Sequence, residues 1–323
     1  MGEKYHDSHG WDYVRDPDGD YSIRGKKGLF RRIGGGDGEG GGCCGCGCLI
    51  FVLLFVPIYE GWLTTYYRFF TPWNTHIVAP PAGTYAGERI VRTVNGVEFA
   101  FRWCPPGEFM MGSPEDELGR NSDENLHEVK LTKGFWLSET EITKKQWDAV
   151  WNGEFELSRS YSSEDLPVRG LPWRYCNAFC KKTGTQLPTE AQWEYACRAG
   201  TTGRFAGDLD EMGWYGKNSD RKIHEVAQKK PNAWGLYDMH GNAEEWCTDY
   251  YWHWYDTSQV TDPEREILPD EILVYLLGSM KHVQRGGIFY MDDKYCRSAS
   301  RFHTTSWLED DVAGFRIVLV PKE

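Results

Sequence analysis

The sequence predicts an irregular, loop-rich fold that combines short strands with short helices. Its 323 residues include 15 Trp, 18 Tyr, 15 Phe and 36 Gly, and this composition suits ordered loops around an aromatic core better than a helical bundle. Alternating or apolar runs at 90–92, 97–103 and 109–112 are separated by turn residues, which is typical of strands and hairpins. Two further strands, at 127–131 and 135–137, are expected to pair with each other.

Three helices are expected in the middle of the chain. The first, over 143–150, would begin with a capping box, because Thr and Gln stand three residues apart at its start. The second covers 173–182 and carries Cys176 and Cys180 on one face, a pattern more typical of small buried side chains than of metal ligands. The third has the sequence TEAQWEYACRAG at 189–200 and is closed by a glycine.

Charge and cysteine usage exclude two classes of function. The formal net charge of −12 argues against nucleic acid as a partner, because phosphate binding needs a basic face. Four of the ten cysteines crowd into 43–48, and the other six are scattered. No CxxC pair is followed by a second pair at zinc spacing, which argues against a zinc site.

The N-terminal part reads as a tail followed by a membrane segment. Residues 1–42 are polar and Gly-rich, end in GGGDGEGGG, and predict a disordered tail. From 43 to 63 the only charge is Glu60, and aromatic residues follow up to residue 70, as expected of one membrane-spanning segment with an interfacial belt. Basic residues before the segment predict a cytoplasmic N-terminus and an outside C-terminal domain.

An alternative for the same segment is a lipid anchor. Palmitoylated cysteines within 43–48 would hold the chain on the membrane surface and leave the domain in the cytosol. In either case the Pro-bearing stretch 71–86 reads as a linker, and the folded domain is expected over 87–323.

The stretch 231–250, PNAWGLYDMHGNAEEWCTDY, is the densest cluster of Gly, Asn, acidic and Trp residues in the chain. Its glycines and Asn242 tolerate positive φ and so predict a looped backbone. Four carboxylates lie within it: Asp238, Glu244, Glu245 and Asp249. Hard oxygen ligands on an aromatic base suggest a calcium site, whereas a packed acidic Ω-loop would show the same spacing, and the residues alone leave both open.

Ordered blocks along the chain identify a family. They are FMMGSPEDELGRNSDE, HEVKLTKGFWLSETEITKKQWDAV, LPTEAQWEYACRAGTT, KKPNAWGLYDMHGNAEEW and the terminal QRGG, CRSASR and AGFRIV. Together they resemble the formylglycine-generating enzyme (sulfatase-modifying factor) family over about residues 87–320. The resemblance implies one α+β domain with a C-type-lectin-like core, little regular secondary structure and long ordered loops.

The resemblance also implies a structural calcium ion in the loop 231–250. Carried over residue by residue, its ligands would be the side chains of Asp238 and Glu245 and the backbone carbonyls of Gly241 and Ala243. Carboxylates and carbonyl oxygens are ligands that calcium prefers. The sequence departs from the family pattern at Glu244, where the family usually has Trp.

Enzymes of the resembled family oxidise a substrate cysteine to formylglycine with dioxygen, using two cysteines that bind copper(I). The matching segment here is RGGIFYMDDKYCRSASR, in which Cys296 matches the second cysteine and Met291 stands at the first. A thioether cannot form a thiolate or take part in disulfide exchange. We therefore expect no catalytic residue and no copper, and the alternative is a formylglycine-generating oxidase that acts on a protein cysteine.

The C-terminal segment 288–307 predicts a binding face for an unknown protein or surface ligand. It mixes aromatic, small polar and acidic residues as ligand-binding paratopes do, and it resembles the variable proteins of diversity-generating retroelements, which share this fold. An ordinary divergent loop and a structural partner-binding domain are the alternatives. The candidate ligand contacts are Ile288, Phe289, Tyr290, Asp292, Asp293, Tyr295, Phe302, His303, Thr304 and Trp307.

Overall fold

The computed structural model divides into two compact units, Met1–Leu49 and Ile50–Glu323. In the first unit it describes three strands, which form an antiparallel sheet in the order β1-β2-β3: Lys4–His6, Asp12–Arg15 and Tyr21–Arg24. The rest of the predicted tail over 1–42 lies outside the described residues. In the second unit the described residues are 75–155, 157–255, 260–265, 281–305 and 312–322.

The predicted single-pass membrane localisation is corrected by the structure. Across the described ranges, no helix is both long and apolar enough to cross a bilayer. The segment 43–63, on which the prediction depended, lies outside those ranges. The membrane span and its inside-to-outside topology are therefore withdrawn.

The described residues of the predicted linker pack on the domain. Ile77 N–H donates to the carbonyl of Thr183 at 2.7 Å, and the indole of Trp136 donates to the carbonyl of Pro81 at 3.0 Å. The ordered part of the second unit therefore includes residues 75–86.

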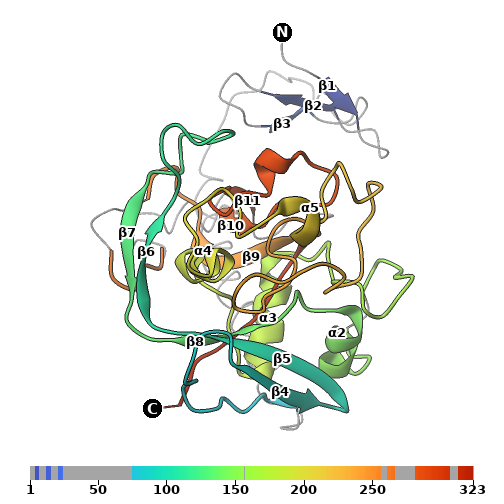
Figure 1. The fold of residues 1–323 in the computed structure, drawn as a ribbon. Helices are drawn as coiled ribbons and strands as arrows, with labels where there is room; N and C mark the ends of the chain where they lie inside the picture. The colour runs from blue at the N-terminus through green and yellow to red at the C-terminus, as the bar shows by residue number, and fades with distance from the viewer. Residues whose placement is uncertain are drawn as a thin grey trace, which may run out of the picture. The chain divides into compact units, whose positions relative to one another are not determined.

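One four-stranded antiparallel sheet has the order β13-β8-β5-β4, and Figure 1 shows β4, β5 and β8 at one end of the domain. β4 (Arg89–Val94) and β5 (Val97–Cys104) form a hairpin. Its two-residue turn, Asn95–Gly96, has φ of 47° and 84°, which is the backbone that an Asn-Gly hairpin turn requires. The central strand β8 (Phe135–Ser138) is buried throughout and pairs with both β5 and β13 (Val318–Leu319).

The sequence placed the strands 127–131 and 135–137 correctly but paired them wrongly. β7 (His127–Leu131) pairs with β6 (Gly107–Met111) in a separate two-stranded sheet, and β8 belongs to the sheet described above. All four residues of β8 are buried, so both faces of this strand are covered, whereas β7 alternates buried and more exposed residues and has one covered face. The two strands therefore suit different sheets.

The second four-stranded sheet carries the motifs of the C-terminal half. Its order is β11-β10-β9-β12, with β12 parallel to β9 and the other pairs antiparallel. The strands are β9 (Glu244–Tyr250), β10 (Lys281–Arg285), β11 (Phe302–Thr305) and β12 (Ala313–Gly314). β9 therefore begins inside the acidic loop, and β11 forms the edge of the sheet within the predicted binding segment.

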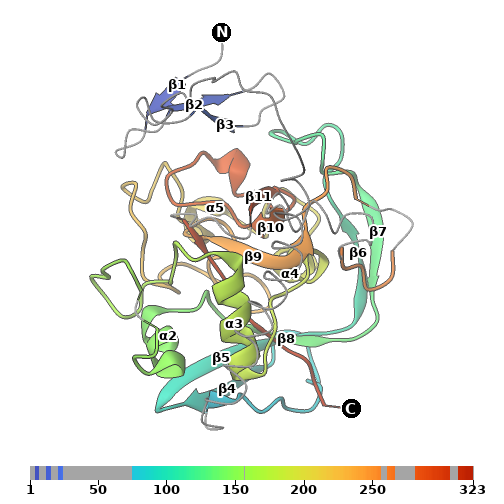
Figure 2. The same ribbon diagram turned by 180° about the vertical axis from the view of Figure 1, so that it is seen from behind.

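All three predicted helices are present, and a short fourth follows them. They are α2 (Lys144–Trp151), α3 (Trp173–Thr183), α4 (Glu190–Arg198) and α5 (Leu209–Met212). Both α2 and α4 begin with a complete capping box, from Thr143 and Thr189. Figure 2 shows α2 and α3 beside the β4–β5 hairpin, and α4 contacts β6, β9 and β10.

The core is aromatic, as the composition predicted. The rings of Trp147 and Phe179 stack at 5.5 Å between centroids, and Phe315 meets both edge-on, so α2, α3 and the C-terminal segment share one cluster. Cys176 and Cys180 are buried in this cluster, which confirms their predicted role as small apolar side chains.

Candidate functional site

Four arginines between residues 285 and 316 are buried and fix this part of the chain to the rest of the domain. Each one forms an ion pair with a glutamate far away in the sequence, and burial of such charges is tolerated only when they are paired and hydrogen-bonded. The pairs are Arg285–Glu194, Arg297–Glu124, Arg301–Glu190 and Arg316–Glu245. Sequence analysis assigned no role to these arginines, although all four lie in the C-terminal motif blocks QRGG, CRSASR and AGFRIV.

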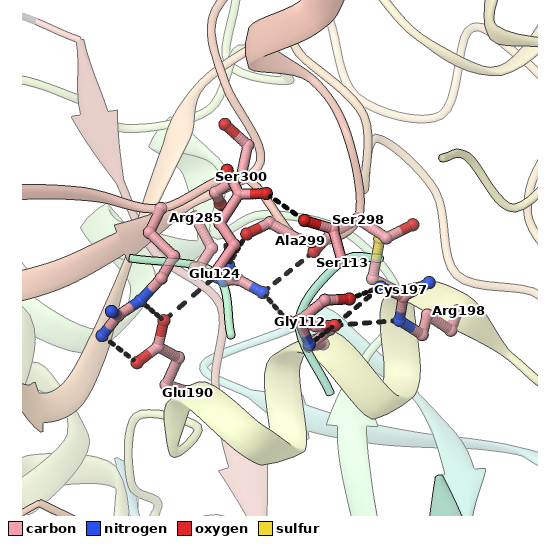
Figure 3. A network of polar contacts seen from close by, with 12 residues as sticks. Gly112, Ser113, Glu124, Glu190, Cys197, Arg198, Arg285, Ser298, Ala299 and Ser300 are labelled. Atoms are coloured by element: carbon pink, nitrogen blue, oxygen red, sulfur yellow. Dashed lines mark hydrogen bonds and ion pairs between the residues drawn. The ribbon is translucent and has the colours of Figure 1, made fainter. Parts of the chain in front are cut away.

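Arg285 holds the turn that follows the 3-10 helix η2 (Asp293–Tyr295). Its guanidinium donates to three successive carbonyls, those of Ser298, Ala299 and Ser300, at 2.8–3.0 Å. The same guanidinium contacts Glu194 of α4. Figure 3 labels Arg285 together with Ser298, Ala299 and Ser300 in this polar network. The turn 298–300 is therefore held by a side chain of β10.

Arg297 and Arg301 fix two neighbouring loops against the same segment. Arg297 binds both oxygens of Glu124 at 2.7 and 2.6 Å, and it also contacts Glu117 at 2.7 Å. Arg301 binds both oxygens of Glu190 at 2.7 and 2.9 Å and lies over the rings of Tyr251 and Tyr255. The loop 113–126 and the aromatic stretch 251–255 are thus held against the residues predicted to bind ligand.

The predicted calcium residues lie in one loop, but their polar groups are engaged differently. Glu245 accepts from Arg316 at 2.5 and 2.6 Å and from the indole of Trp193 at 2.7 Å. Asp238 accepts from the N–H of Ala227 at 2.8 Å through one oxygen, and its other oxygen is buried with no hydrogen-bond partner. Burial raises the pKa of Asp238 to about 6.

The remaining two predicted contacts were the backbone carbonyls of Gly241 and Ala243. The N–H groups of the same two residues hold the loop backbone in place: Gly241 donates to the carbonyl of Gly286 at 2.8 Å, and Ala243 donates to Glu141 at 3.0 Å. Glu141 is a third buried carboxyl here, and burial together with the charges of Asp238 and Glu245 raises its pKa. This acid was missed because it lies about a hundred residues upstream of the loop.

The unpartnered oxygen of Asp238 suits a cation, but Glu245 does not fit the role that the resemblance implied. Its two oxygens already bind a guanidinium, and a divalent cation at the same oxygens would meet that positive charge. Within the described ranges, no group of three or more His, Cys, Asp or Glu side chains is arranged to hold a metal ion.

Calcium should therefore change the thermal stability of the protein very little. We expect midpoints within about 2 °C of each other in 5 mM EDTA and in excess CaCl2, because a ligand raises stability only when the native state offers it a site. Differential scanning fluorimetry measures the difference, with MgCl2 as the control for ionic strength. A rise of several degrees that is specific to calcium would contradict the assignment of Glu245 to Arg316.

Of the two positions of the family's redox cysteines, the first is half-buried and the second is fully buried. Met291 packs in an apolar cluster with Ile288, Phe289 and Val312. Cys296 is fully buried against Leu209 and Tyr215, and burial raises the pKa of its thiol far above the usual range. A buried neutral thiol at one position and a thioether at the other do not form the thiolate pair that the resemblance implied for the oxidase reaction.

A buried contact joins Cys197 and His240, but the hydrogen bonds of the imidazole exclude an activated nucleophile. The sulfur of Cys197 lies 3.8 Å from Nε2 of His240. That nitrogen accepts from the N–H of Ala206 at 3.0 Å, and Nδ1 donates to the carbonyl of Cys296 at 2.8 Å, so the ring is neutral. Burial lowers the pKa of His240 to about 4 and raises that of Cys197 to about 12.

None of the six cysteines of the domain should react with iodoacetamide in the native protein at pH 8. All six are free, buried and have raised pKa values: Cys104, Cys176, Cys180, Cys197, Cys247 and Cys296. Peptide mapping by mass spectrometry should find each of them labelled only after denaturation in 6 M guanidinium. Rapid native labelling of Cys296 would show an accessible thiolate and reopen the oxidase interpretation.

Two of the predicted ligand contacts, Ile288 and Phe289, face the interior and do not present themselves to a ligand. They follow Gly286 and Gly287, which have φ of 100° and 76°, and this left-handed turn directs the chain inward. Phe289 is fixed there by its N–H to the carbonyl of Asn242 at 3.1 Å.

The other described members of the predicted set lie at or near the surface. Tyr290 is 37% exposed and Asp292 is exposed, whereas the remainder are half-buried. We call this set the outer C-terminal face: Tyr290, Asp292, Asp293, Tyr295, Phe302, His303 and Thr304. Trp307 lies outside the described residues. His303 contacts the ring of Tyr251 at 3.9 Å, so the face continues toward Trp252 and Trp254, which are 50% and 55% exposed and were missed.

Comparison of the sequence with models of known protein families shows the family of this chain. A profile of the sulfatase-modifying factor enzyme 1-like domain matches residues 99–320. The chain belongs to this family. The described part of the match has the few short helices and mixed sheets expected of a sulfatase-modifying factor domain, so the predicted recognition is confirmed.

Members and neighbours of the sulfatase-modifying factor family resemble the chain over part of its length. It is 32% identical to the formylglycine-generating enzyme of Streptomyces coelicolor over 171 residues, 46% of this chain and 51% of that protein. The chain thus spans about half the length of that curated relative.

Two solved structures share the fold, each at 24% sequence identity. PvdO from Pseudomonas aeruginosa has a TM-score of 0.64 and covers 74% of this chain and 100% of its own. Variable protein 1 of Treponema denticola has a TM-score of 0.57, with 72% and 99% covered.

Proposed function

We propose that this chain is a non-catalytic ligand-binding protein that contacts its ligand through the outer C-terminal face. The observation that carries the proposal is the state of the two redox positions, with Met291 at the first and a fully buried Cys296 at the second. Function resides in the site and not in the fold, and this site lacks the thiolate pair.

The construction of the face supports binding. Arg285, Arg297 and Arg301 fix its backbone from below, so a ligand would meet a rigid surface and little conformational entropy would be lost on binding. Its exposed positions carry tyrosine and aspartate, residues that suit an amphipathic contact surface.

A diversified version of this proposal has a specific argument in its favour. The ion pairs of the buried arginines run to Glu194, Glu124 and Glu190 and not to Tyr290, Asp292 or His303, so changes at these three positions would leave those ion pairs in place. The fold likeness to the Treponema variable protein motivates this version. A neighbouring reverse-transcriptase gene with an adenine-rich template repeat that matches residues 285–318 is expected if the version is right, and its absence would remove it.

The direct test of the proposal is an oxidase assay on the purified full chain. The protein is incubated with copper(I), dioxygen and a CxPxR peptide, and the peptide mass is followed, with the Streptomyces coelicolor enzyme as a positive control. We expect no conversion of cysteine to formylglycine. Catalytic turnover of the peptide by this chain would overturn the non-catalytic proposal in favour of the oxidase alternative.

A further inference from the structure

The loop 114–120 lies directly beside the outer C-terminal face. Glu117 in this loop binds Arg297 at 2.7 Å. Gly119 has φ of 87°, and a Cβ built on it would lie 2.7 Å from Cβ of Lys294 in η2, so only glycine permits this approach. The loop is thus held against η2 in a fixed conformation, although about 175 residues of sequence separate the two.

This loop presents two acids and an apolar side chain outward. Glu115 and Asp116 are exposed, and neither forms an ion pair with any residue in the described ranges. Leu118, two residues further on, is 74% exposed, although burying such a side chain is worth roughly 2 kcal/mol. An apolar side chain fixed in this position beside carboxylates suits contact with a partner.

The cations and the carboxylates around the loop 114–120 differ in their exposure and in their contacts. Arg204 pairs with Asp293 at 3.5 Å. Lys294 lies over the ring of Tyr295 at 4.8 Å and Arg120 donates to the carbonyl of Ser113 at 3.3 Å, and all three cations are half-buried. Asp292 joins Glu115 and Asp116 as an exposed carboxylate with no ion pair to a described residue. Among these charges the exposed ones are therefore the three carboxylates, whereas the cations are half-buried.

We infer that the partner of this face is a basic protein segment, whose lysine or arginine side chains meet Glu115, Asp116 and Asp292 while its apolar part covers Leu118 and Tyr290. This inference rests on the proposed function and names the class of its ligand. The ring of Tyr295 already carries the Lys294 ammonium at 4.8 Å, and the exposed ring of Tyr290 is a second aromatic surface of the kind that attracts a cation. Complementary charge of this kind gives binding that weakens with salt.

The test measures binding of the full chain to immobilised 15-residue peptides by biolayer interferometry. A Lys/Arg-rich peptide with interspersed Leu is compared with its Glu-rich counterpart and a neutral one, at 50 and 300 mM NaCl. We expect binding to the basic peptide alone, and at least a tenfold loss in the triple variant Glu115→Gln/Asp116→Asn/Asp292→Asn. Leu118→Ser should weaken binding at both salt concentrations, because its contribution is apolar.

The control variant Glu98→Gln/Glu128→Gln/Glu164→Gln changes the net charge by the same amount at exposed carboxylates outside the face. It should alter the affinity less than threefold. Equal losses in the two triple variants, binding of the acidic peptide, or no binding of the basic peptide would each overturn the inference. These outcomes leave the proposed function standing, whereas peptide oxidation in the copper assay removes both.

Discussion

Replacing Arg316 with methionine should lower the free energy of unfolding by about 3–5 kcal/mol. The guanidinium is fully buried and binds both oxygens of Glu245. Methionine fills a similar volume but leaves that carboxylate buried near Glu141 and Asp238 without a cation. The expected loss therefore comes mainly from an uncompensated charge, and urea titration at pH 7 measures it.

Two companion variants separate this cause from lost packing. Arg221→Met removes an exposed arginine and should stay within about 0.5 kcal/mol of the wild type. The double variant Arg316→Met/Glu245→Leu removes both charges and should recover part of the stability that the single change loses. If the double variant instead loses as much stability as Arg316→Met and Glu245→Leu lose in sum when each is measured alone, the ion-pair explanation fails.

The second large effect is a fall in stability as the pH rises from about 4 to about 7, to which Asp249 contributes. Burial, with the nearby charge of Glu190, raises the pKa of Asp249 from 3.8 to about 7. Between these values the folded state binds a proton that the unfolded state has lost, so stability decreases with pH in this window. This rise in the pKa of Asp249 corresponds to a loss of at most roughly 4 kcal/mol in the free energy of unfolding across the window.

Urea titrations of the wild type and Asp249→Asn at several pH values between 4.5 and 7.5 isolate this contribution. The asparagine cannot ionise, so the difference between the two free energies should change steadily with pH. A constant offset is also expected, since the carboxylate accepts from the N–H groups of Glu190 and Arg265 and an amide has one acceptor oxygen. Asp220→Asn is the control at an exposed aspartate, and its free energy of unfolding plotted against pH should run parallel to that of the wild type. A parallel curve for Asp249→Asn would show that Asp249 titrates normally.

Local features of the fold were predictable from the sequence. The capping boxes at Thr143 and Thr189 place helix starts correctly, since both partners lie within one turn of each other. The Asn95–Gly96 turn similarly defines its hairpin. The partner of β7 was not predictable, because pairing depends on the environment that each strand finds in three dimensions.

The candidate site was predicted less well, for the same physical reason. Alternation of aromatic and acidic residues marked the segment 288–307, yet the glycine pair at 286–287 turns Ile288 and Phe289 inward. The engagement of Glu245 by Arg316 depends on residues 71 positions apart. Calcium binding was implied by residue types, whereas the availability of their oxygens is a property of the folded contacts.

The pairing of β13 with β8 has a consequence for synthesis of the chain. Besides that pair, Ser138 and Ile142 donate their N–H groups to the carbonyls of Ile317 and Phe315. A nascent chain can pair β8 with β5 as soon as β8 has emerged, but the opposite edge of this largely apolar strand stays unpaired until residues 315–319 have emerged from the ribosome. We expect ribosome-bound intermediates stalled before this point to recruit holdase chaperones, and chains that have passed it to release them.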